Sequence, residues 1–321
     1  MKILVTGGAG FIGSQIIKFF NKNTAWEITS LDRLSYAGNQ NRLVGSNART
    51  VFHDLRAEIN QEVSASLGQF DYIFHLAASS HVPNSIANPV DAVMNNVLGT
   101  CNMLNFARDQ KALKRFFFFS TDEVFGSAED GQIFDENSRY NSLNPYSATK
   151  AGAEELCHAF SNTYEIPVTA IHPSNVFGPD QHSEKFVPMV VSKIMRSEQV
   201  LIHCRDGKPA ERQFIHSDDV ASACKHLIQT DAQLRKVNIS GEEHWDVLSL
   251  CLFIAKILGK PLDYKMVEHD PSRPNFDQKY HTSSNALAGI GWRPMISRSI
   301  TNSLPDIVKQ YRDDIESLSI R

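Results

Sequence analysis

The sequence predicts an α/β protein, with a doubly wound, Rossmann-like parallel sheet and a smaller, partly interleaved C-terminal α/β domain. Strand-like runs alternate with segments of helix length through the first half of the chain. A glycine-rich turn follows the first of these runs and precedes a helix-like run. Beyond about residue 172 the pieces become shorter and are interrupted by prolines, which marks a second region.

Seven runs have the composition of strands, and the segments between them are long enough for helices. A parallel crossover needs a helix to return the chain, so we expect helices on both faces of the sheet. Residues 1–172 are expected to form the first domain, and residues 173–321 mainly the second, with some later segments returning to the first. The predicted strands are KILVTG (2–7), EITSLD (27–32), RTVFHD (49–54), DYIFHLAA (71–78), RFFFFSTD (115–122), PVTAIHPSNV (167–176) and KVNIS (236–240).

Composition excludes several classes of protein. A chain of 321 residues, 42% of them hydrophobic, can bury one large core or two modest ones. The formal net charge of -4 comes without a basic stripe, which argues against a nucleic-acid partner. The five cysteines are spaced for neither a disulfide framework nor a metal site. Without an apolar run of membrane-spanning length or a secretory leader, we expect a cytoplasmic protein with no membrane partner and no metal.

The stretch VTGGAGFIGS places Gly7, Gly10 and Gly13 between the first strand and an apolar run with helical spacing. Such a tight turn brings backbone N–H groups and the positive end of the helix close to a pyrophosphate, and a side chain at Gly7 or Gly10 would block that approach. Strand, glycines, helix and a following acid together predict a dinucleotide-binding site.

The following acid is Asp32, at the end of the second predicted strand. A carboxylate there accepts hydrogen bonds from the adenosine ribose hydroxyls and repels a 2′-phosphate, which favours NAD over NADP. Arg33 is either a partner for such a phosphate or a solvated surface charge. Asp54, which closes the third strand, either meets the adenine amino group or caps the next helix.

A tyrosine and a lysine in NPYSATK, Tyr146 and Lys150, lie four residues apart and therefore on one face of a helix. We expect the lysine ammonium to favour the phenolate and to lower the pKa of Tyr146 toward neutrality, so that the oxygen can accept a proton from a hydroxyl. A tyrosine and a lysine four residues apart occur by chance on many helices. The pair indicates a catalytic site here because Thr121 lies upstream, at the end of a predicted strand.

Two adjacent acids, Asp122 and Glu123, follow the apolar run RFFFFS. Neighbouring carboxylates repel each other and push their pKa values apart, so that one can stay an acid while the other is a base. The alternative is a pair of solvent-facing loop acids. Because ligands of open α/β sheets bind beyond the carboxyl ends of the strands, the position favours a functional pair.

The motifs TGGAGFIG, HLAA, STDEVFG and NPYSATK resemble those of the extended short-chain dehydrogenase/reductase superfamily, and the resemblance runs almost end to end. Within it, the chain looks most like the nucleotide-sugar 4,6-dehydratases of the dTDP-glucose type. Sugar epimerases share the glycine and YxxxK motifs but usually carry small residues in place of Asp122 and Glu123. The resemblance therefore implies a dehydratase.

The resemblance implies a role for each residue of the predicted catalytic group. Tyr146, beside Lys150, takes the C4 hydroxyl proton of a hexose while hydride passes to NAD. Glu123 then removes the C5 proton, and Asp122 protonates the departing C6 hydroxyl, so that water leaves and hydride returns to C6. Thr121 hydrogen-bonds the C4 oxygen and orients the sugar.

The resemblance also implies the residues that bind the two ligands. The expected NAD-binding residues are Gly7, Gly10, Phe11, Ile12, Gly13, Asp32, Arg33, Ser35, Asp54, Leu55, Ala77, Ala78, Ser79, Asn95, Tyr146 and Lys150. The expected substrate-binding residues are Ser80, His81, Thr121, Asn175, Glu184, Lys185, Phe186, Arg212, Asn238 and Arg273.

Departures from the dTDP-glucose pattern gather among the predicted substrate contacts. They are Pro83 and Asn84 in place of Asp-Arg, Val176 and Phe177 in place of Asn-Tyr, Gln213 and Phe214 in place of Asp-Trp, and Phe276 in place of His. UDP, another nucleotide or an amino sugar therefore stays open as part of the substrate. The reaction type rests on the five catalytic residues, which are all present.

Two other functions stay open from the sequence. The first is a nucleotide-sugar epimerase or decarboxylase that uses only the 4-keto step, and the second is a dinucleotide-sensing protein without catalysis. The intact Tyr146 and Lys150 pair argues against the sensor. The resemblance further implies a homodimer in which two long helices per subunit, expected at residues 89–109 and 145–164, pack as a four-helix bundle.

Overall fold

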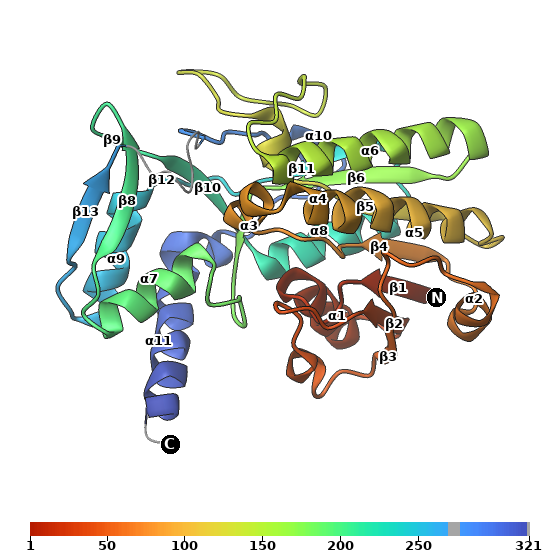
Figure 1. Cartoon of the computed structure of the whole chain (residues 1–321), viewed down its shortest axis with the longest axis horizontal. Coiled ribbons are helices and arrows are strands. Elements are labelled where there is room, and N and C mark those ends of the chain that lie inside the picture. Colours follow the sequence, from red (N-terminus) through yellow and green to blue (C-terminus); the bar gives the residue numbers. More distant parts are fainter. Residues whose placement is uncertain (269–276, 320–321) are drawn as a thin grey trace.

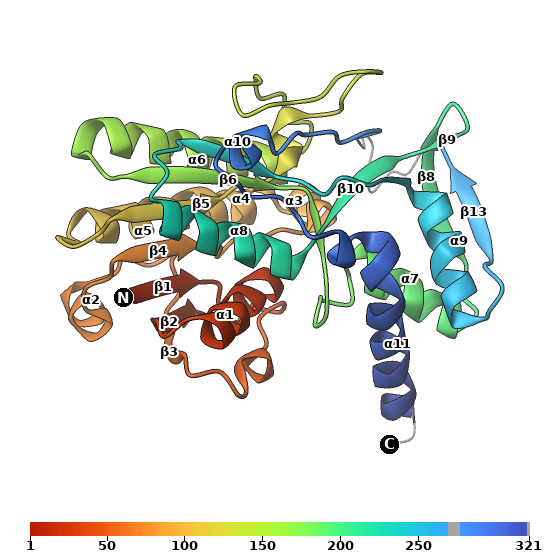
Figure 2. The same ribbon diagram turned by 180° about the vertical axis from the view of Figure 1, so that it is seen from behind.

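The structure is a computed structural model that describes residues 1–268 and 277–319. A seven-stranded sheet with the order β11-β6-β5-β4-β1-β2-β3 forms its larger part (Figures 1 and 2). Every neighbouring pair in it is parallel, and each strand lies within one of the seven predicted runs. This confirms the doubly wound α/β fold class. The strands are β1 (Lys2–Thr6), β2 (Glu27–Asp32), β3 (Arg49–Phe52), β4 (Tyr72–His75), β5 (Arg115–Phe119), β6 (Val168–Pro173) and β11 (Lys236–Ile239).

Helices cover both faces of this sheet. On one face α1 (Phe11–Asn23) packs beside α8 (Ser217–Thr230), and on the other α5 (Gly99–Arg108) packs beside α6 (Pro145–Tyr164). Each face therefore has its own apolar core. Around them lie η1 (Gln40–Leu43), α2 (Gln61–Leu67), α3 (Val82–Ala87), α4 (Pro89–Val93), the π-helical turn η2 (Met94–Leu98), the 3-10 helix η3 (Asp122–Phe125) and α10 (Asn285–Gly289).

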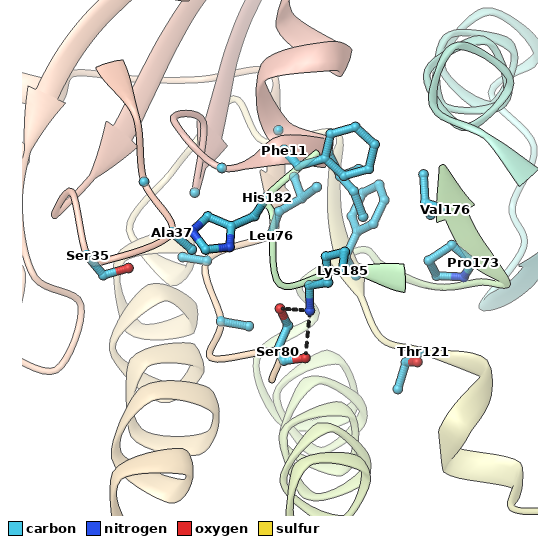
Figure 3. A pocket seen from close by; sticks show the side chains of 18 of the residues that line it. Phe11, Ser35, Ala37, Leu76, Ser80, Thr121, Pro173, Val176, His182 and Lys185 are labelled. Atoms are coloured by element: carbon cyan, nitrogen blue, oxygen red, sulfur yellow. Dashed lines mark hydrogen bonds between the residues drawn. The ribbon is translucent and has the colours of Figure 1, made fainter. Parts of the chain in front are cut away.

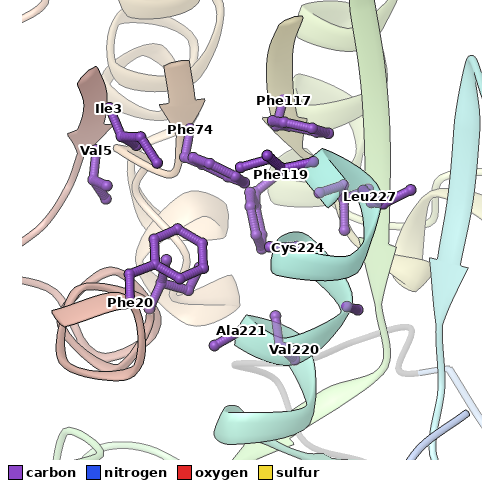
Figure 4. Close-up of a cluster of buried hydrophobic side chains, with 14 of the residues drawn as sticks. Ile3, Val5, Phe20, Phe74, Phe117, Phe119, Val220, Ala221, Cys224 and Leu227 are labelled. Carbon is purple, nitrogen blue, oxygen red and sulfur yellow. The ribbon is translucent and has the colours of Figure 1, made fainter. Parts of the chain in front are cut away.

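The core under α1 and α8 shows why the runs of the sheet are apolar (Figure 4). Phe20 of α1 meets Phe74 of β4 edge-on at 5.6 Å between ring centroids, and Phe74 stacks on Phe117 of β5 at 4.6 Å. Cys224 of α8 is fully buried in the same cluster. Strands buried on both faces are mainly apolar, and the polar groups that can face a ligand lie at their ends.

The smaller part of the molecule is built from short sheets and three helices beyond residue 172. One sheet has the order β12-β10-β7 and the other β13-β8-β9, and α7, α9 and α11 share one apolar core with them. The elements are β7 (Asn175–Phe177), α7 (Phe186–Met195), β8 (Val200–Arg205), β9 (Lys208–Pro209), β10 (Glu211–His216), β12 (His244–Asp246), α9 (Val247–Leu258), β13 (Tyr264–Val267), η4 (Ile296–Arg298) and α11 (Ile300–Ser319).

Chain segments from the second half also belong to the large sheet. Strand β11 pairs with β6 at its edge, α8 packs on α1, and α10 contacts β11. The exact division of the chain at residue 172 stays a prediction. Among the described residues, none of the helices has the length and apolarity that a membrane crossing needs.

Candidate active site

A cavity of about 350 Å³ lies at the carboxyl ends of the parallel strands (Figure 3). It is lined by Gly7 after β1, Asp32 at the end of β2, Ala77 after β4, Thr121 after β5 and Asn175 after β6. Parallel strands end at the same edge of a sheet, so residues far apart in sequence meet there. The predicted cofactor and catalytic motifs therefore share one cavity.

The glycine motif after β1 packs tightly at the cavity, because Gly7 and Gly13 leave no room for a side chain. Gly7 has φ +70°, and a Cβ on it would lie 2.8 Å from the Ala77 backbone nitrogen. A Cβ on Gly13 would collide with the Gly7 carbonyl oxygen. Helix α1 starts directly after Gly10, so its N–H groups and positive end face the cavity beside Phe11 and Ile12.

The carboxylate of Asp32 is fixed at the end of β2 and lines the same cavity. It is 9% exposed and accepts hydrogen bonds from the backbone N–H groups of Ala9 at 3.0 Å and Leu34 at 2.8 Å. Each of its oxygens has a free lone pair left for a further donor. An acid held in this way can bind a hydroxyl pair but repels a phosphate.

The neighbouring cation Arg33 is already paired. Its Nη1 lies 3.2 Å from the Asp54 carboxylate, which Arg56 also contacts, at 2.6 Å. The hydrogen bonds from Arg56, and then those from Arg33, hold the pKa of Asp54 well below its usual range. Asp54 thus holds two arginines at the cavity wall. It does not cap the next helix, because α2 begins at Gln61 with Asn60 as its N-cap, and its contact with adenine stays a prediction.

The other predicted cofactor contacts divide into residues on the cavity and one beside it. Ser79 does not line the cavity, because its backbone N–H and C=O both bind the side chain of Asn96, at 2.7 and 3.0 Å. It lies instead on a smaller neighbouring cavity. The remaining predicted cofactor contacts do line the main cavity: Ser35, Leu55, Ala77, Ala78 and Asn95.

The two adjacent acids begin a short 3-10 helix, η3, directly after β5. Thr121 caps this helix, and its hydroxyl accepts a hydrogen bond from the Glu123 N–H at 3.3 Å. Asp122 is only 4% exposed, and its Oδ2 has no hydrogen-bond partner. Burial, and then the charge of Glu123, raise the pKa of Asp122 to about 8, so it is mainly protonated at neutral pH.

Glu123 is tied to the helix that carries the tyrosine and lysine. Its Oε2 accepts a hydrogen bond at 3.1 Å from the side chain of Asn144. Asn144 is also the N-cap of α6 and forms a capping box with Ser147. One residue thus fixes the start of α6 relative to the acids of η3.

Tyr146 and Lys150 lie in the first turns of α6, and both line the cavity. The expectation that Lys150 lowers the pKa of Tyr146 is wrong for the protein alone. Burial, followed by the charge of Glu123, raises the pKa of Tyr146 above its ordinary value, against a smaller opposing effect of the Thr121 hydroxyl. Burial also lowers the pKa of Lys150 to about 8.

Five of the predicted substrate contacts besides Thr121 line the cavity: Ser80, Asn175, Glu184, Lys185 and Phe186. The Lys185 ammonium donates to the Ser80 carbonyl at 3.1 Å and to its hydroxyl at 3.2 Å (Figure 3). Glu184 accepts a hydrogen bond at 3.2 Å from the Tyr36 hydroxyl. These contacts join the loop before α7 to the loop after β2 and to the loop after β4, beside the cavity.

Three other predicted substrate contacts do not line the cavity: His81, Arg212 and Asn238. Arg212 donates to the carbonyl oxygens of Glu211 and Asp277 at 2.8 and 2.7 Å, although its charge still acts on the pKa of Asp122. Asn238 is fully buried within β11, opposite His172 of β6. Arg273 and Phe276 lie outside the described residues.

The departures from the dTDP-glucose pattern give the cavity an apolar side. Val176, Phe177 and Phe214 all line it. Gln213 lies away from it and binds the Gly241 carbonyl and the Thr282 N–H, at 3.1 and 2.8 Å. Pro83 and Asn84 belong to α3, and Asn84 lines the smaller cavity.

Several cavity residues were not predicted from the sequence. Arg56 and His182 are two of them, and Gln181, Ala37 and Leu76 are others. Arg56 stands two residues after Asp54, and His182 two before Glu184, so proximity to a predicted contact was the one available signal. Leu76 lies within the HLAA motif, whereas no motif of the sequence analysis contains Ala37, Arg56, Gln181 or His182, which only the folded chain brings to the cavity.

Comparison with known proteins gives the family. The model of the NAD dependent epimerase/dehydratase family matches residues 3–240. The chain belongs to this family. It is 31% identical to the dTDP-glucose 4,6-dehydratase of Salmonella typhimurium, over 92% of this chain and 89% of that protein. It is 33% identical to the low-salt glycan biosynthesis protein Agl12 of Haloferax volcanii, over 98% of this chain and all of that protein.

Solved structures of the family share the whole architecture. The dTDP-glucose 4,6-dehydratase DesIV of Streptomyces venezuelae, with NAD and TYD bound, has a TM-score of 0.88 at 30% identity, covering 98% of this chain and 97% of that one. The UDP-glucose 4-epimerase of Thermotoga maritima, with UDP-glucose, has a TM-score of 0.86 at 25% identity, covering 98% and 100%. These matches confirm the resemblance that the motifs predicted.

NAD as the cofactor is confirmed by the family, and the cavity of this chain fits it. The glycine turn packs so closely on the backbone after β4 that Gly7 has no room for a Cβ, its glycines line the cavity, and Asp32 offers acceptors beside it. Arg33, the side chain that would attract a 2′-phosphate, is held by Asp54. The chain therefore has the features of an NAD site and not those of an NADP site.

Proposed function

We propose that this protein is a nucleotide-sugar 4,6-dehydratase, which converts dTDP-glucose or a related NDP-hexose into the NDP-4-keto-6-deoxyhexose. The observation that carries the proposal is the pair at the start of η3. Asp122 is buried with an unpaired oxygen and a pKa raised to about 8, while Glu123, beside it, also lines the cavity. The elimination of water needs both a base and an acid at one site.

The first step is the removal of the C4 hydroxyl proton by Tyr146. Thr121 hydrogen-bonds the C4 oxygen and orients the sugar, and Lys150 supplies positive charge from the next turn of α6. NAD would be held by the glycine turn after β1 and by Asp32, and there it would supply a hydride acceptor and a positive charge that favours the phenolate of Tyr146. The raised pKa of Tyr146 therefore belongs to the protein alone.

The second step is the loss of water across C5 and C6. Glu123 takes the C5 proton, which the 4-ketone has made acidic, and its bond to Asn144 keeps its carboxylate oriented. Asp122 donates its proton to the departing C6 hydroxyl. Since Asp122 is protonated below about pH 8, the acid is ready at neutral pH without a separate proton source.

Substrate binding is assigned to the side of the cavity that faces α7. Asn175, Glu184, Lys185 and Phe186 line that side and would hold the diphosphate and sugar, with Ser80 opposite. Val176 and Phe214 add apolar surface in places where the dTDP-glucose pattern has polar or larger residues. The proposal leaves the nucleotide to experiment.

A homodimer is part of the same proposal. Helix α4 and the turn η2 expose three apolar side chains, with Val90 69%, Val93 46% and Met94 40% exposed. Helix α6 beside them exposes small residues, among them Ala148, Gly152 and Ala159. A paired copy would cover both surfaces as a four-helix bundle, and the molar mass in solution, with Val93→Glu as the disrupting variant, tests this.

We also propose a cytoplasmic location. All five cysteines are free thiols, and four of them are buried, three of these in the apolar cores. Thiols of this kind persist in a reducing compartment.

The deciding experiment is incubation of the purified protein with NAD and a panel of dTDP- and UDP-hexoses, followed by mass spectrometry. A dehydratase product has lost one water, about 18 mass units, with NAD unchanged overall. An epimer of unchanged mass would indicate a 4-epimerase, and loss of carbon dioxide a decarboxylase. NAD binding without turnover of any sugar would contradict all three enzymatic functions and indicate a sensor.

A further inference from the structure

A buried cluster of polar side chains lies under α6, outside the cavity. Its centre is Glu154, which is fully buried and stands one helical turn after Lys150. The Glu154 Oε2 lies 2.9 Å from the His172 Nε2, and its Oε1 lies 3.5 Å from the His158 Nε2. The proposed reaction uses none of these groups.

Two more side chains bind the same carboxylate from other parts of the fold. The Tyr140 hydroxyl donates a hydrogen bond to the Glu154 Oε1, and the Lys236 ammonium of β11 lies 3.6 Å from that oxygen. Lys236 also donates to the Tyr140 hydroxyl at 2.7 Å. The cluster therefore joins α6, the end of β6, the edge strand β11 and the loop before α6.

These contacts leave Glu154 ionised. Burial by itself would raise its pKa, but the charge of His172 and the hydrogen bonds from His158, His172 and Tyr140 together hold the pKa of Glu154 well below its usual range. A buried carboxylate with this many partners is a fixed negative charge inside the protein.

Lys150 lacks a close anionic partner of its own. It is 3% exposed, its ammonium lies 4.3 Å above the Phe118 ring, and among the residues described here no carboxylate is within ion-pair distance of it. Burial lowers the pKa of Lys150, whereas Cys157 and Glu154 oppose that shift. His75, on β4, is the other titratable neighbour.

Of these three neighbours, only Glu154 carries a charge at neutral pH. Burial raises the pKa of the Cys157 thiol well above its ordinary value, and burial, with the charge of Lys150, lowers the pKa of His75 to about 3. Both groups are therefore neutral near pH 7. The helix brings Glu154 and Lys150 onto one face, because residues four apart are neighbours on its surface.

We propose that Glu154 is a positioning residue for Lys150. The buried carboxylate of Glu154 keeps the Lys150 ammonium charged. The bonds from Glu154 to β6, β11 and Tyr140 fix the part of α6 that carries Lys150. The inference rests on the role proposed above for Lys150 in the reaction. Glu154 touches neither the cavity nor a ligand and acts only through this neighbour.

The test is a titration of Lys150 by NMR in the full-length protein with ¹³C-labelled lysine and without ligands, the signal being assigned with Lys150→Met. In the native chain we expect a midpoint near the pKa of about 8. Glu154→Gln should lower this midpoint by about one pH unit, because a neutral amide no longer favours the ammonium. Glu154→Asp keeps the negative charge, so its Lys150 midpoint should lie close to that of the native chain.

Two matched variants separate charge from packing. Glu155→Gln removes an exposed carboxylate one residue further along α6, and Tyr140→Phe removes a hydrogen bond but leaves the carboxylate of Glu154. Neither should move the Lys150 midpoint. An unchanged midpoint in Glu154→Gln, or an equal shift in either control, would overturn the proposal.

If Glu154→Gln does not fold, the double variant Glu154→Gln with His172→Gln replaces the hydrogen-bonded pair with two neutral amides and carries the same expectation. Removing both partners of a buried pair is tolerated better than removing one. Since the titration needs neither substrate nor turnover, its failure would leave the proposed dehydratase reaction standing. The mass-spectrometric screen decides that reaction separately.

Discussion

The large parallel sheet and the smaller region beyond residue 172 contribute differently to one cavity. The sheet brings Gly7, Asp32 and Thr121 to its carboxyl edge at the ends of β1, β2 and β5, each followed by the residues that the motifs predict. The smaller region contributes loops, the short strand β7, the start of α7 and Phe214 of β10, and β7 pairs with β10, a strand far away in sequence. Positions at strand ends are fixed by the topology, whereas positions on loops depend on packing that a single chain segment does not encode.

The largest effect is expected where the sheet places the chemistry. Glu123→Gln removes the base but keeps the shape of the side chain, and should reduce the formation of the 4-keto-6-deoxy product by about 10³-fold. NAD affinity should stay unchanged. Solvent deuterium incorporation at C5 is the measurement, and incorporation at the native rate would contradict the assignment of Glu123.

Asp122→Asn tests the acid of the same pair, with an expected loss in kcat of about 10²-fold. In the native enzyme, activity should fall as the pH rises through about 8, because Asp122 then loses the proton that it donates. This decline should be weaker in the variant. A pH profile of kcat with the same alkaline decline in both proteins would count against Asp122 as the acid.

The same variant has a thermodynamic signature. Folding raises the pKa of Asp122, so the native state binds more protons than the unfolded state between the ordinary pKa of an aspartate and about pH 8, and native stability falls as the pH rises through that window. Asp122→Asn should therefore raise the melting temperature at pH 9, by about 3 °C, and change it less at pH 4. A stabilisation that is equal at both pH values would be inconsistent with the buried acid.

Asp32→Asn tests the cofactor side of the cavity with a smaller expected effect. An amide offers one acceptor where the carboxylate offers two, so NAD affinity should fall by about 10-fold, measured by calorimetry. Affinity for NADP should fall less, because the repulsion of a 2′-phosphate is also removed. Asp71→Asn, an acid at the opposite end of the sheet, serves as the control and should change neither affinity.

The smallest effect is expected at Asn238, which was predicted to bind substrate but lies off the cavity, buried in β11. Asn238→Ala should leave KM within about twofold of the native value. Lys185→Met, at a predicted contact that does line the cavity, should raise KM by about 10-fold, because a cation facing the diphosphate is lost. If both variants raise KM equally, the distinction between the two regions does not hold.

The sequence predicted most of the sheet because its signals are local. An apolar run, a glycine turn at Gly7 and an acid at Asp32 each show within a few residues where a strand ends. The YxxxK spacing placed Tyr146 and Lys150 on one helix face, as the structure has them. The pKa of Tyr146 was predicted in the wrong direction, because burial and the acids of η3 outweigh the one neighbour that the spacing reveals.

Only the tertiary structure decided two sets of contacts. These are the pairing of Arg33 with Asp54 and the cluster around Glu154. The partners in both come from segments that no motif connects. The sequence by itself determined the positions of the strands along the chain, the cofactor turn and the residue types of the chemistry, since these depend on backbone periodicity and on neighbours along the chain. Charge states and loop contacts depend on burial and on distances through space, and these exist only once the chain has folded.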